Sequence, residues 1–284
     1  MILNIQSDSK VRRQKRINTI KQMSKKVDIL GVKLSITSMK HTLSTIERWI
    51  EKKEPHYVCV TSAHGIMESQ RNKEFRNIIN SAGLVTPDGM PLVWLSRFKG
   101  YKSVDRVYGP DLMLKLSELA ERRGYSNFFY GARNGIPEKL SAALRKKFPH
   151  LKIAGTYSPP FRPLTSKEDR EVINMINDAS PDIVWVGIST PKQEKWMAEH
   201  LGKTKTTVMI GVGAAFDFLS GAKRQAPKWM QRSGLEWLFR LITEPRRLWR
   251  RYLIGNTMFI WSILKEFFQK RNPHQKDKEN KNER

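Results

Sequence analysis

The sequence of 284 residues contains a single cysteine, Cys59. One cysteine cannot form a disulfide framework or a four-cysteine zinc site within the chain, and it fits a reducing compartment. The motif Asp-x-Asp is absent, and the six histidines show no His-x-x-x-His spacing. We therefore expect no metal site and no cofactor. Neither a P-loop nor a Gly-x-Ser-x-Gly motif is present, which disfavours kinase and serine hydrolase activities.

Long apolar runs are also missing. Residues 1–26 contain no apolar core of a secretory signal. The longest apolar stretch, residues 252–263, is interrupted by a glycine and polar residues and is too short to cross a bilayer. At 39% apolar residues the chain is nevertheless long enough to bury a sizeable core. These features predict a globular, cytoplasmic protein without a transmembrane helix.

Acidic residues are scarce: 27 Asp and Glu oppose 52 Lys and Arg, for a net charge of +25. The excess is concentrated at the ends, with +7 in residues 1–26 and +10 in residues 222–284. Such a distribution favours a polyanion near both termini, either nucleic acid, anionic lipid or a phosphorylated substrate. The alternative is solvated tails, and we expect residues 1–26 to be a flexible basic leader and residues 269–284 a disordered basic tail.

Short β-rich segments alternate with amphipathic helical segments between the charged ends. The expected strands are residues 56–61, 126–131, 151–157, 182–187 and 206–212. Helical patterns follow near 137–147, near 167–177 and from residue 191. This alternation predicts an α/β fold, Rossmann-like, with a largely parallel sheet flanked by helices. We assign this core to residues 27–225.

Candidate chemistry lies in the loops that follow the strands, because open parallel sheets bind ligands beyond the carboxyl ends of their strands. Gly211 and Gly213 follow the last strand and would let a phosphate approach the backbone. They match a dinucleotide fingerprint poorly, so a diphosphate site and a tight structural turn both remain open. Asp88, in a Pro-Asp-Gly sequence, is either a general base or a turn aspartate. His64 either lines a pocket or is a structural histidine.

Residues 226–268 mix bulky apolar side chains with a dense set of arginines, four of which are Arg240, Arg247, Arg250 and Arg251. This pattern predicts a basic amphipathic helical appendage. It is typical of an interfacial membrane element or of a phosphate clamp. The alternative is a helical hairpin that packs on the core and only exposes its charges.

Seven ordered blocks in this chain resemble the bacterial WecG/TagA/CpsF glycosyltransferases (glycosyltransferase family 26). They are VTPDGMPLVW, RVYGPDLM, FFYGAR, GTYSPPF, STPKQEKWM, GVGAAFDFLSG and GLEWLFRLITEPRR, within about residues 27–252. The resemblance implies an inverting, metal-independent enzyme. It would transfer a sugar from a UDP-sugar to a polyprenyl-diphosphate-linked saccharide at the cytoplasmic face of the inner membrane. The products of such enzymes are precursors of cell-surface polysaccharides and exopolysaccharides.

The resemblance also implies roles for particular residues, with Asp88 as the catalytic base. Three positions match active-site residues of the family: Thr61, Arg106 and Gln193. Three arginines match those of a C-terminal appendage that closes the site and meets the membrane: Arg240, Arg247 and Arg250. Without a metal, arginines and backbone N–H groups must stabilise the charge of the departing diphosphate. Arg106, these arginines and the turn from Gly211 to Gly213 are the groups we expect to do so.

One departure from the family leaves the sugar open. Many members have Thr-x-Asn where this chain has Thr61, Ser62 and Ala63, followed by His64. The asparagine's role is therefore absent or has passed to His64. Admissible donors carry N-acetylmannosamine or its uronic acid, or glucose or glucuronic acid. Self-association into a homo-oligomer also remains open. The competing hypothesis is a non-catalytic, basic nucleic-acid- or membrane-binding protein, although no nucleic-acid reading module is recognisable, so we expect no specific nucleic acid partner.

Overall fold

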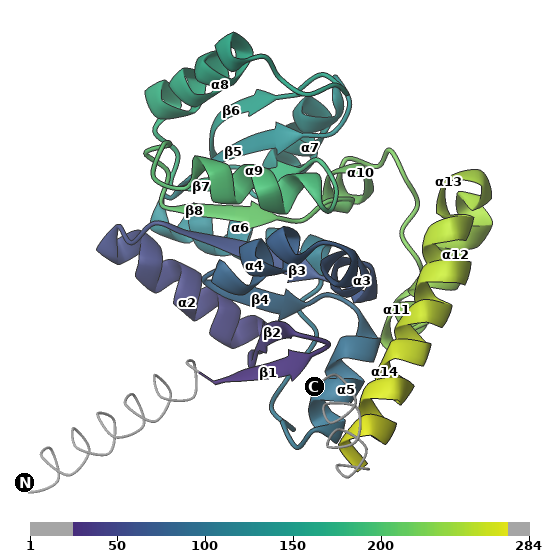
Figure 1. Ribbon diagram of the computed structural model, residues 1–284. Coiled ribbons are helices and arrows are strands. Elements are labelled where there is room, and N and C mark those ends of the chain that lie inside the picture. The colour runs from purple at the N-terminus through teal and green to yellow at the C-terminus, as the bar shows by residue number, and fades with distance from the viewer. Residues whose placement is uncertain (1–24, 272–284) are drawn as a thin grey trace, which may run out of the picture.

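The computed structural model describes residues 25–271 (Figure 1). Most of the expected leader and tail, residues 1–24 and 272–284, lie outside the described residues. The centre of the fold is a six-stranded sheet with all neighbours parallel and the strand order β4-β3-β8-β7-β5-β6. The strands are β3 (His56–Thr61), β4 (Leu84–Pro87), β5 (Ser126–Gly131), β6 (Lys152–Tyr157), β7 (Ile183–Gly187) and β8 (Val208–Gly211). The predicted parallel, Rossmann-like sheet is confirmed.

Helices cover both faces of the sheet (Figure 1). One layer consists of α3 (Ala63–Arg71), α4 (Lys73–Ser81), α8 (Ser166–Ala179) and α9 (Lys192–His200). The other consists of α2 (Met39–Lys52), α6 (Gly109–Arg123), α7 (Ile136–Lys147) and α10 (Ala215–Leu219). An antiparallel hairpin, β1 (Lys26–Ile29) with β2 (Val32–Ser35), and helix α5 (Met90–Phe98) complete the first layer.

The central strands are apolar on both faces because both faces are covered. In β5, Phe128 and Tyr130 pack into the first layer, whereas Phe129 packs into the second. Trp185 of β7 is buried and donates its indole N–H to the Asn127 side chain, over 2.9 Å. Burial on both sides explains why these strands have continuous apolar sequences rather than an alternating pattern.

The strand order places the loops that matter at one edge of the sheet. The chain builds β3 and β4 at one side, crosses to build β5 and β6 at the other, and returns through β7 and β8 to the centre. Because the strands are parallel, the loops that follow them all emerge at the same edge. The chain winds outward from β3 to β4 on one side and from β5 to β6 on the other, so the winding direction changes in the middle of the sheet, where such sheets bind ligands.

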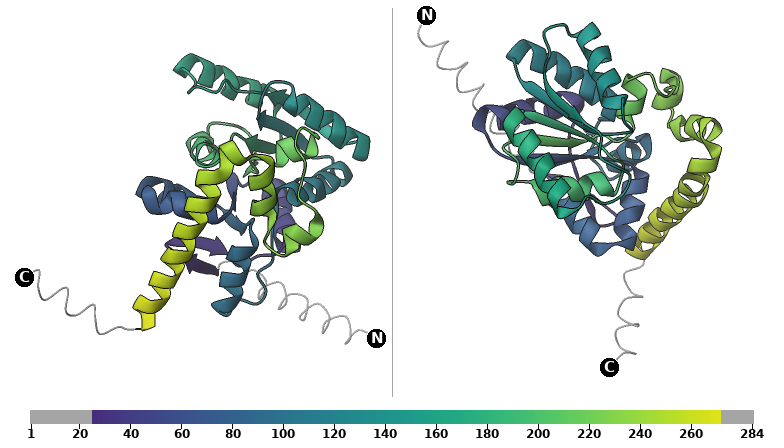
Figure 2. Two further views of the ribbon diagram at one scale, coloured as in Figure 1. Left: turned by 90° about the vertical axis from the view of Figure 1, so that its right-hand side faces the viewer. Right: turned by 90° about the horizontal axis from the view of Figure 1, so that it is seen from above.

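The C-terminal residues form a helical appendage beside this core (Figures 1 and 2). It comprises α11 (Lys228–Arg232), α12 (Glu236–Thr243), α13 (Pro245–Trp249), a π-helical turn η1 (Arg250–Ile254) and α14 (Gly255–Arg271). Helix α14 runs along α3, buries Phe259 and pairs Glu266 with Lys99 over 3.1 Å. It continues to Arg271, past the expected start of the tail at residue 269. Within residues 25–271, no helix is both long and apolar enough to span a bilayer.

Candidate functional site

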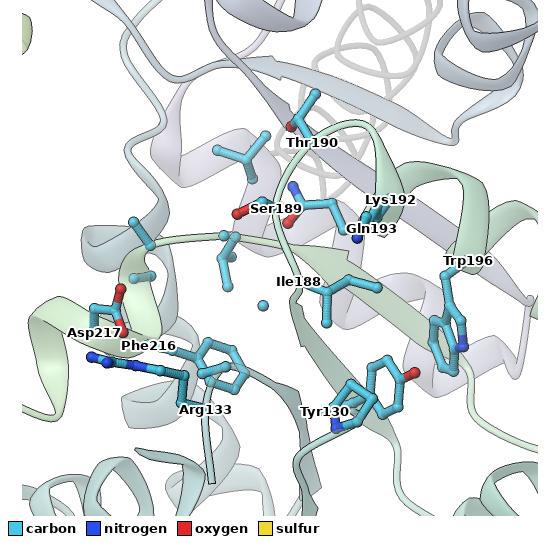
Figure 3. A pocket seen from close by; sticks show the side chains of 18 of the residues that line it. Tyr130, Arg133, Ile188, Ser189, Thr190, Lys192, Gln193, Trp196, Phe216 and Asp217 are labelled. Carbon is cyan, nitrogen blue, oxygen red and sulfur yellow. The ribbon is translucent and has the colours of Figure 1, made fainter. Parts of the chain in front are cut away.

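A cavity of about 1080 Å³ lies at the carboxyl ends of the strands, between the core and the appendage. Loops after β3, β4, β5, β6, β7 and β8 line it, and the appendage supplies the remaining wall. Figure 3 shows part of this wall, with Gln193 beside residues 188–190 and Trp196 next to Tyr130. The site therefore lies where the order of the strands changes direction, as expected for this class of sheet.

Asp88 lies in this cavity, in the loop between β4 and α5. Its backbone N–H donates to the carbonyl of Thr61 over 2.8 Å, which continues the pairing of β4 with β3. Its Oδ1 accepts the N–H of Gly109, the first residue of α6, over 3.1 Å. Within the described residues no hydrogen bond occupies Oδ2. The side chain thus holds the start of a distant helix with one oxygen, while the other has no hydrogen-bond partner among the described residues.

The electrostatic surroundings of Asp88 suit a base that works near neutral pH. Burial is the largest influence and raises the pKa of Asp88. Arg106 opposes this effect, Glu236 adds to it, and the resulting pKa is about 6. A carboxyl group with this pKa is mostly ionised at pH 7, yet it is a stronger base than an ordinary aspartate.

Arg106 connects Asp88 to the appendage. It donates to the Asp88 carbonyl oxygen and to the carbonyl of Gln231, and it pairs with the Glu236 carboxylate at 2.5 Å. Its guanidinium also lies 4.1 Å from the ring centroid of Tyr108, whose hydroxyl donates to Glu236 over 3.0 Å. Burial opposes the positive charge of Arg106, but Asp88 and Glu236 raise its pKa above the usual value. Arg106 is therefore a charged group next to Asp88 that does not itself line the cavity.

The appendage contributes three arginines to the cavity wall: Arg240, Arg247 and Arg251. The Nε atoms of Arg240 and Arg251 are buried and have no hydrogen-bond partner among residues 25–271. Burial, assisted by the neighbouring Arg240 and Arg247, lowers the pKa of Arg251. Unpaired guanidinium groups held this close together favour a bound anion. Arg250, which the resemblance singled out, does not line the cavity, and its guanidinium lies 5.2 Å from the ring centroid of Trp249.

A chain of ion pairs ties the appendage to the core at the cavity wall. Lys223 contacts Asp217 at 2.9 Å and Glu244 at 3.0 Å, and Arg247 contacts Glu244 at 2.6 Å. Burial alone would raise the pKa of Glu244, but hydrogen bonds from Arg247 and Lys223 lower it to about 2. Lysine and arginine thus supply positive charge to the site. Among residues 25–271, no three His, Cys, Asp or Glu side chains gather where they could hold a metal ion.

Helix α9 presents polar and aromatic groups from the opposite wall. Gln193 lines the cavity, and its Oε1 is buried without a partner in the described part of the chain. The indole N–H of Trp196 is also buried, and no described residue accepts a hydrogen bond from it. The Trp196 ring stacks between Tyr130, at 4.3 Å between centroids, and His200, at 4.2 Å. This wall therefore lines the cavity with an aromatic surface and with a glutamine amide.

The other predicted residues fall in and around the cavity. Gly213 lines it with a left-handed φ of +52°. Gly211 is inside β8 instead, where a β-carbon would lie 2.8 Å from the Met197 side chain, so close packing explains that glycine.

Thr61 is buried beneath the cavity and donates to the carbonyl of Cys59 over 3.4 Å. His64 lies on α3 beside Glu68, outside the lining, and burial lowers its pKa to about 3.

Several residues at the site escaped the sequence analysis: Tyr130, Glu194, Trp196, Lys223 and Glu236. A signal existed for Trp196, which lies one helical turn after Gln193 in the STPKQEKWM block and therefore shares its helix face. For Glu236 no such signal existed, because its contact with Arg106 spans 130 residues of the chain.

Comparison with known proteins places this site in a family. The model of the family described as "Glycosyl transferase WecG/TagA/CpsF family" matches residues 27–273. A relative from Bacillus spizizenii is 31% identical over 73% of this chain and 78% of its own length. A relative from Bacillus subtilis is 28% identical over 82% of this chain and 91% of its own length. One from Staphylococcus aureus is 27% identical over 84% of this chain and 92% of its own length. All three are named N-acetylglucosaminyldiphosphoundecaprenol N-acetyl-beta-D-mannosaminyltransferase. The predicted resemblance is confirmed: the chain is a glycosyltransferase and belongs to the WecG/TagA/CpsF family.

Proposed function

We propose that this protein transfers N-acetylmannosamine from its UDP-sugar to polyprenyl-diphosphate-linked N-acetylglucosamine, with inversion and without a metal ion. The names of the relatives support the sugar and the acceptor. The observation that carries the mechanism is the geometry of the cavity. Asp88 offers a carboxylate oxygen to it, and Arg240, Arg247 and Arg251 converge on it from the appendage. A single base and a cationic cluster are the two parts that such a displacement requires.

In the proposed step, Asp88 accepts the proton of the acceptor hydroxyl as that oxygen attacks the anomeric carbon. The new glycosidic bond forms on one face of the sugar while the bond to the β-phosphate oxygen breaks on the other. The electron pair of the broken bond leaves with UDP. One carboxylate suffices because the displacement is direct and inverts the configuration.

In the second part of the proposed mechanism, the arginines stabilise the leaving group. Negative charge increases on the β-phosphate as the bond to the sugar breaks. Guanidinium groups already held at the cavity wall stabilise this charge without reorganising. Arg240 and Arg251, which line the cavity and whose Nε atoms have no partner among the described residues, are the arginines that we assign to that role. In this proposal they do the work that a divalent cation does in metal-dependent transferases.

The purified protein tests the proposal directly. We expect UDP release when UDP-N-acetylmannosamine and a synthetic polyprenyl-diphosphate N-acetylglucosamine are both present, at the same rate with and without EDTA. UDP-glucose, UDP-glucuronic acid and the uronic acid of N-acetylmannosamine serve as comparison donors. Release that needs added Mg²⁺ or Mn²⁺ would overturn metal independence. Faster release with a comparison donor would overturn the sugar but not the reaction.

We also propose that the appendage attaches the enzyme peripherally to the cytoplasmic face of the inner membrane, where a lipid-linked acceptor is found. Exposed bulky apolar side chains are concentrated on it: Trp229, Ile242, Trp249, Leu253, Ile254, Ile260, Trp261, Leu264 and Phe268. Arginines such as Arg246 and Arg250 are exposed among them. Apolar side chains mixed with basic ones favour binding to an anionic bilayer surface.

Vesicle sedimentation tests this attachment with point variants, because truncation would remove the partners of Arg106. We expect the wild type to sediment with phosphatidylglycerol-containing vesicles and less with pure phosphatidylcholine. The double variant Trp261→Ser, Phe268→Ser should lose at least about tenfold in vesicle affinity, because two large apolar groups no longer enter the bilayer. Met175→Ser, which changes an exposed apolar residue on α8, is the control. Equal sedimentation of the double variant and the control would contradict the proposal.

A further inference from the structure

A buried carboxylate lies directly behind the amide of Gln193. Glu194 follows Gln193 on the first turn of α9. Glu194 is 1% exposed and Gln193 is 2% exposed. Gln193 lines the cavity, whereas Glu194 does not. Oε1 of Glu194 accepts two hydrogen bonds, from the Thr190 hydroxyl over 2.8 Å and from Nε2 of Gln193 over 3.1 Å. The glutamine amide is therefore held from behind by an acceptor.

This contact decides which end of the amide faces the cavity. The oxygen and nitrogen ends of a glutamine amide have nearly the same shape, so packing alone does not distinguish them. A carboxylate can only accept, so Gln193 must turn its NH₂ group toward Glu194. Burial raises the pKa of Glu194, but a proton on Oε2 would leave Oε1 an acceptor all the same. In both protonation states of Glu194, Oε1 of Gln193 is therefore the end of the amide that faces the cavity. There it is buried and has no partner among the described residues.

The position of this oxygen indicates what it contacts. A β-carbon at Gly213 would lie 3.5 Å from Oε1 of Gln193, so the amide borders the loop after β8. The preceding residue, Val212, touches the start of α6, where the N–H of Gly109 binds Asp88. Gln193 and Asp88 thus belong to one continuous floor. In the proposed reaction the base must reach the oxygen that attacks the anomeric carbon, which would place the transferred sugar over this floor.

We infer that Glu194 is a positioning residue that fixes Gln193 as a hydrogen-bond acceptor for a hydroxyl or N–H group of the transferred sugar. A fixed acceptor repels phosphate oxygens, so Gln193 contacts the sugar and the diphosphate lies on the arginine side. This inference rests on the proposed function, because it needs a UDP-sugar in the cavity. It also gives the sugar a defined orientation between Gln193 and the arginines of the appendage.

Binding titrations of two nucleotides test the inference without relying on turnover. In Glu194→Gln the residue behind Gln193 can donate as well as accept, so the Gln193 amide is free to flip. We expect this variant to bind UDP-N-acetylmannosamine about tenfold more weakly, the effect of one lost hydrogen bond at a buried group. Its affinity for UDP, which has no sugar to contact, should stay within about twofold.

The reciprocal variant Gln193→Glu, Glu194→Gln is the sharper test. The carboxylate at position 193 can only accept hydrogen bonds, whichever way it is turned, and the amide at position 194 donates to it from behind. The Thr190 hydroxyl can accept as well as donate, so the contacts around residue 194 can be remade. We expect the affinity for UDP-N-acetylmannosamine to return to within about threefold of the wild type. A purely structural role for Glu194 predicts no such rescue.

Controls separate the possible failures. Glu171→Gln makes the same change on the exposed face of α8 and should alter neither affinity. Melting temperatures identify variants that fail to fold. Equal loss of UDP and UDP-sugar affinity in a folded Glu194→Gln, or no loss at all, would overturn the inference, as would a folded double variant that does not recover. A wild type that binds neither nucleotide would overturn the proposed function, and this inference with it.

Discussion

Replacing Asp88 with asparagine should lower kcat for sugar transfer by about 10²- to 10⁴-fold, the usual contribution of a general base. Asparagine has the size of aspartate and can still accept the N–H of Gly109, so the loop and the start of α6 should keep their structure. Its amide cannot take the proton of the attacking hydroxyl. The affinity for the UDP-sugar should therefore change little while turnover is lost.

Single-turnover assays, with the UDP-sugar affinity measured separately, check this expectation. Asp105→Asn is the matched control, because Asp105 is exposed and pairs with Arg97 on the surface. The control should retain wild-type turnover. Substantial turnover in Asp88→Asn would show that another group, or water alone, removes the proton.

The pH profile provides an independent check on the same residue. With a pKa of about 6, Asp88 loses its basic form as the pH falls through 6, so the rate at pH 5 should be about tenfold below the plateau at high pH. Glu236 is a neighbouring like charge that raises this pKa. Glu236→Gln should therefore lower the pKa of Asp88 and extend activity to lower pH. An acid limb that does not move would indicate that a different group titrates.

Much of this site could be predicted from the sequence because of one property of parallel sheets. Parallel strands end at the same edge, so loops far apart in the chain, such as those of Asp88 and Gly213, are brought together by the sheet itself. The pattern of strands and helices was sufficient to predict that meeting. It was not sufficient to predict the strand order, which depends on how the helical layers pack.

The appendage shows where such reasoning stops. Glu236 reaches Arg106 only because α12 packs against the cavity, and no local pattern encodes that contact. The helix that carries the arginines changes to a π-helical turn, η1, at Arg250, and propensities do not reveal this turn. Arg250 and Arg251 follow Arg247 at i+3 and i+4, and both positions lie on the same helix face as Arg247, so spacing alone does not decide which of them enters the cavity. The resemblance favours Arg250 at this position, whereas the structure places Arg251 in the cavity.

This difference leads to the second large expected effect. Arg251→Ala should lower kcat/KM by about 10²- to 10³-fold, as expected when a preorganised donor to developing negative charge is removed. Arg250→Ala should lower it by no more than about threefold, because the exposed Arg250 side chain lies over Trp249 outside the cavity. Both variants remove one positive charge from adjacent positions, so each is the control for the other. A larger loss of kcat/KM in Arg250→Ala than in Arg251→Ala would instead support Arg250, the arginine that the resemblance favours, as the phosphate contact.

Two further measurements distinguish a phosphate contact from a packing effect. UDP affinity should fall in Arg251→Ala, because UDP retains the diphosphate, and the loss should shrink as ionic strength rises and screens the interaction. Arg251→Lys keeps the charge but not the guanidinium fork, so it should recover only part of the activity. If Arg251 were instead a structural residue, its loss would lower the melting temperature and weaken UDP and UDP-sugar binding without this dependence on salt. The arginine cluster would then hold the appendage in place, and the charge of the leaving diphosphate would need another partner.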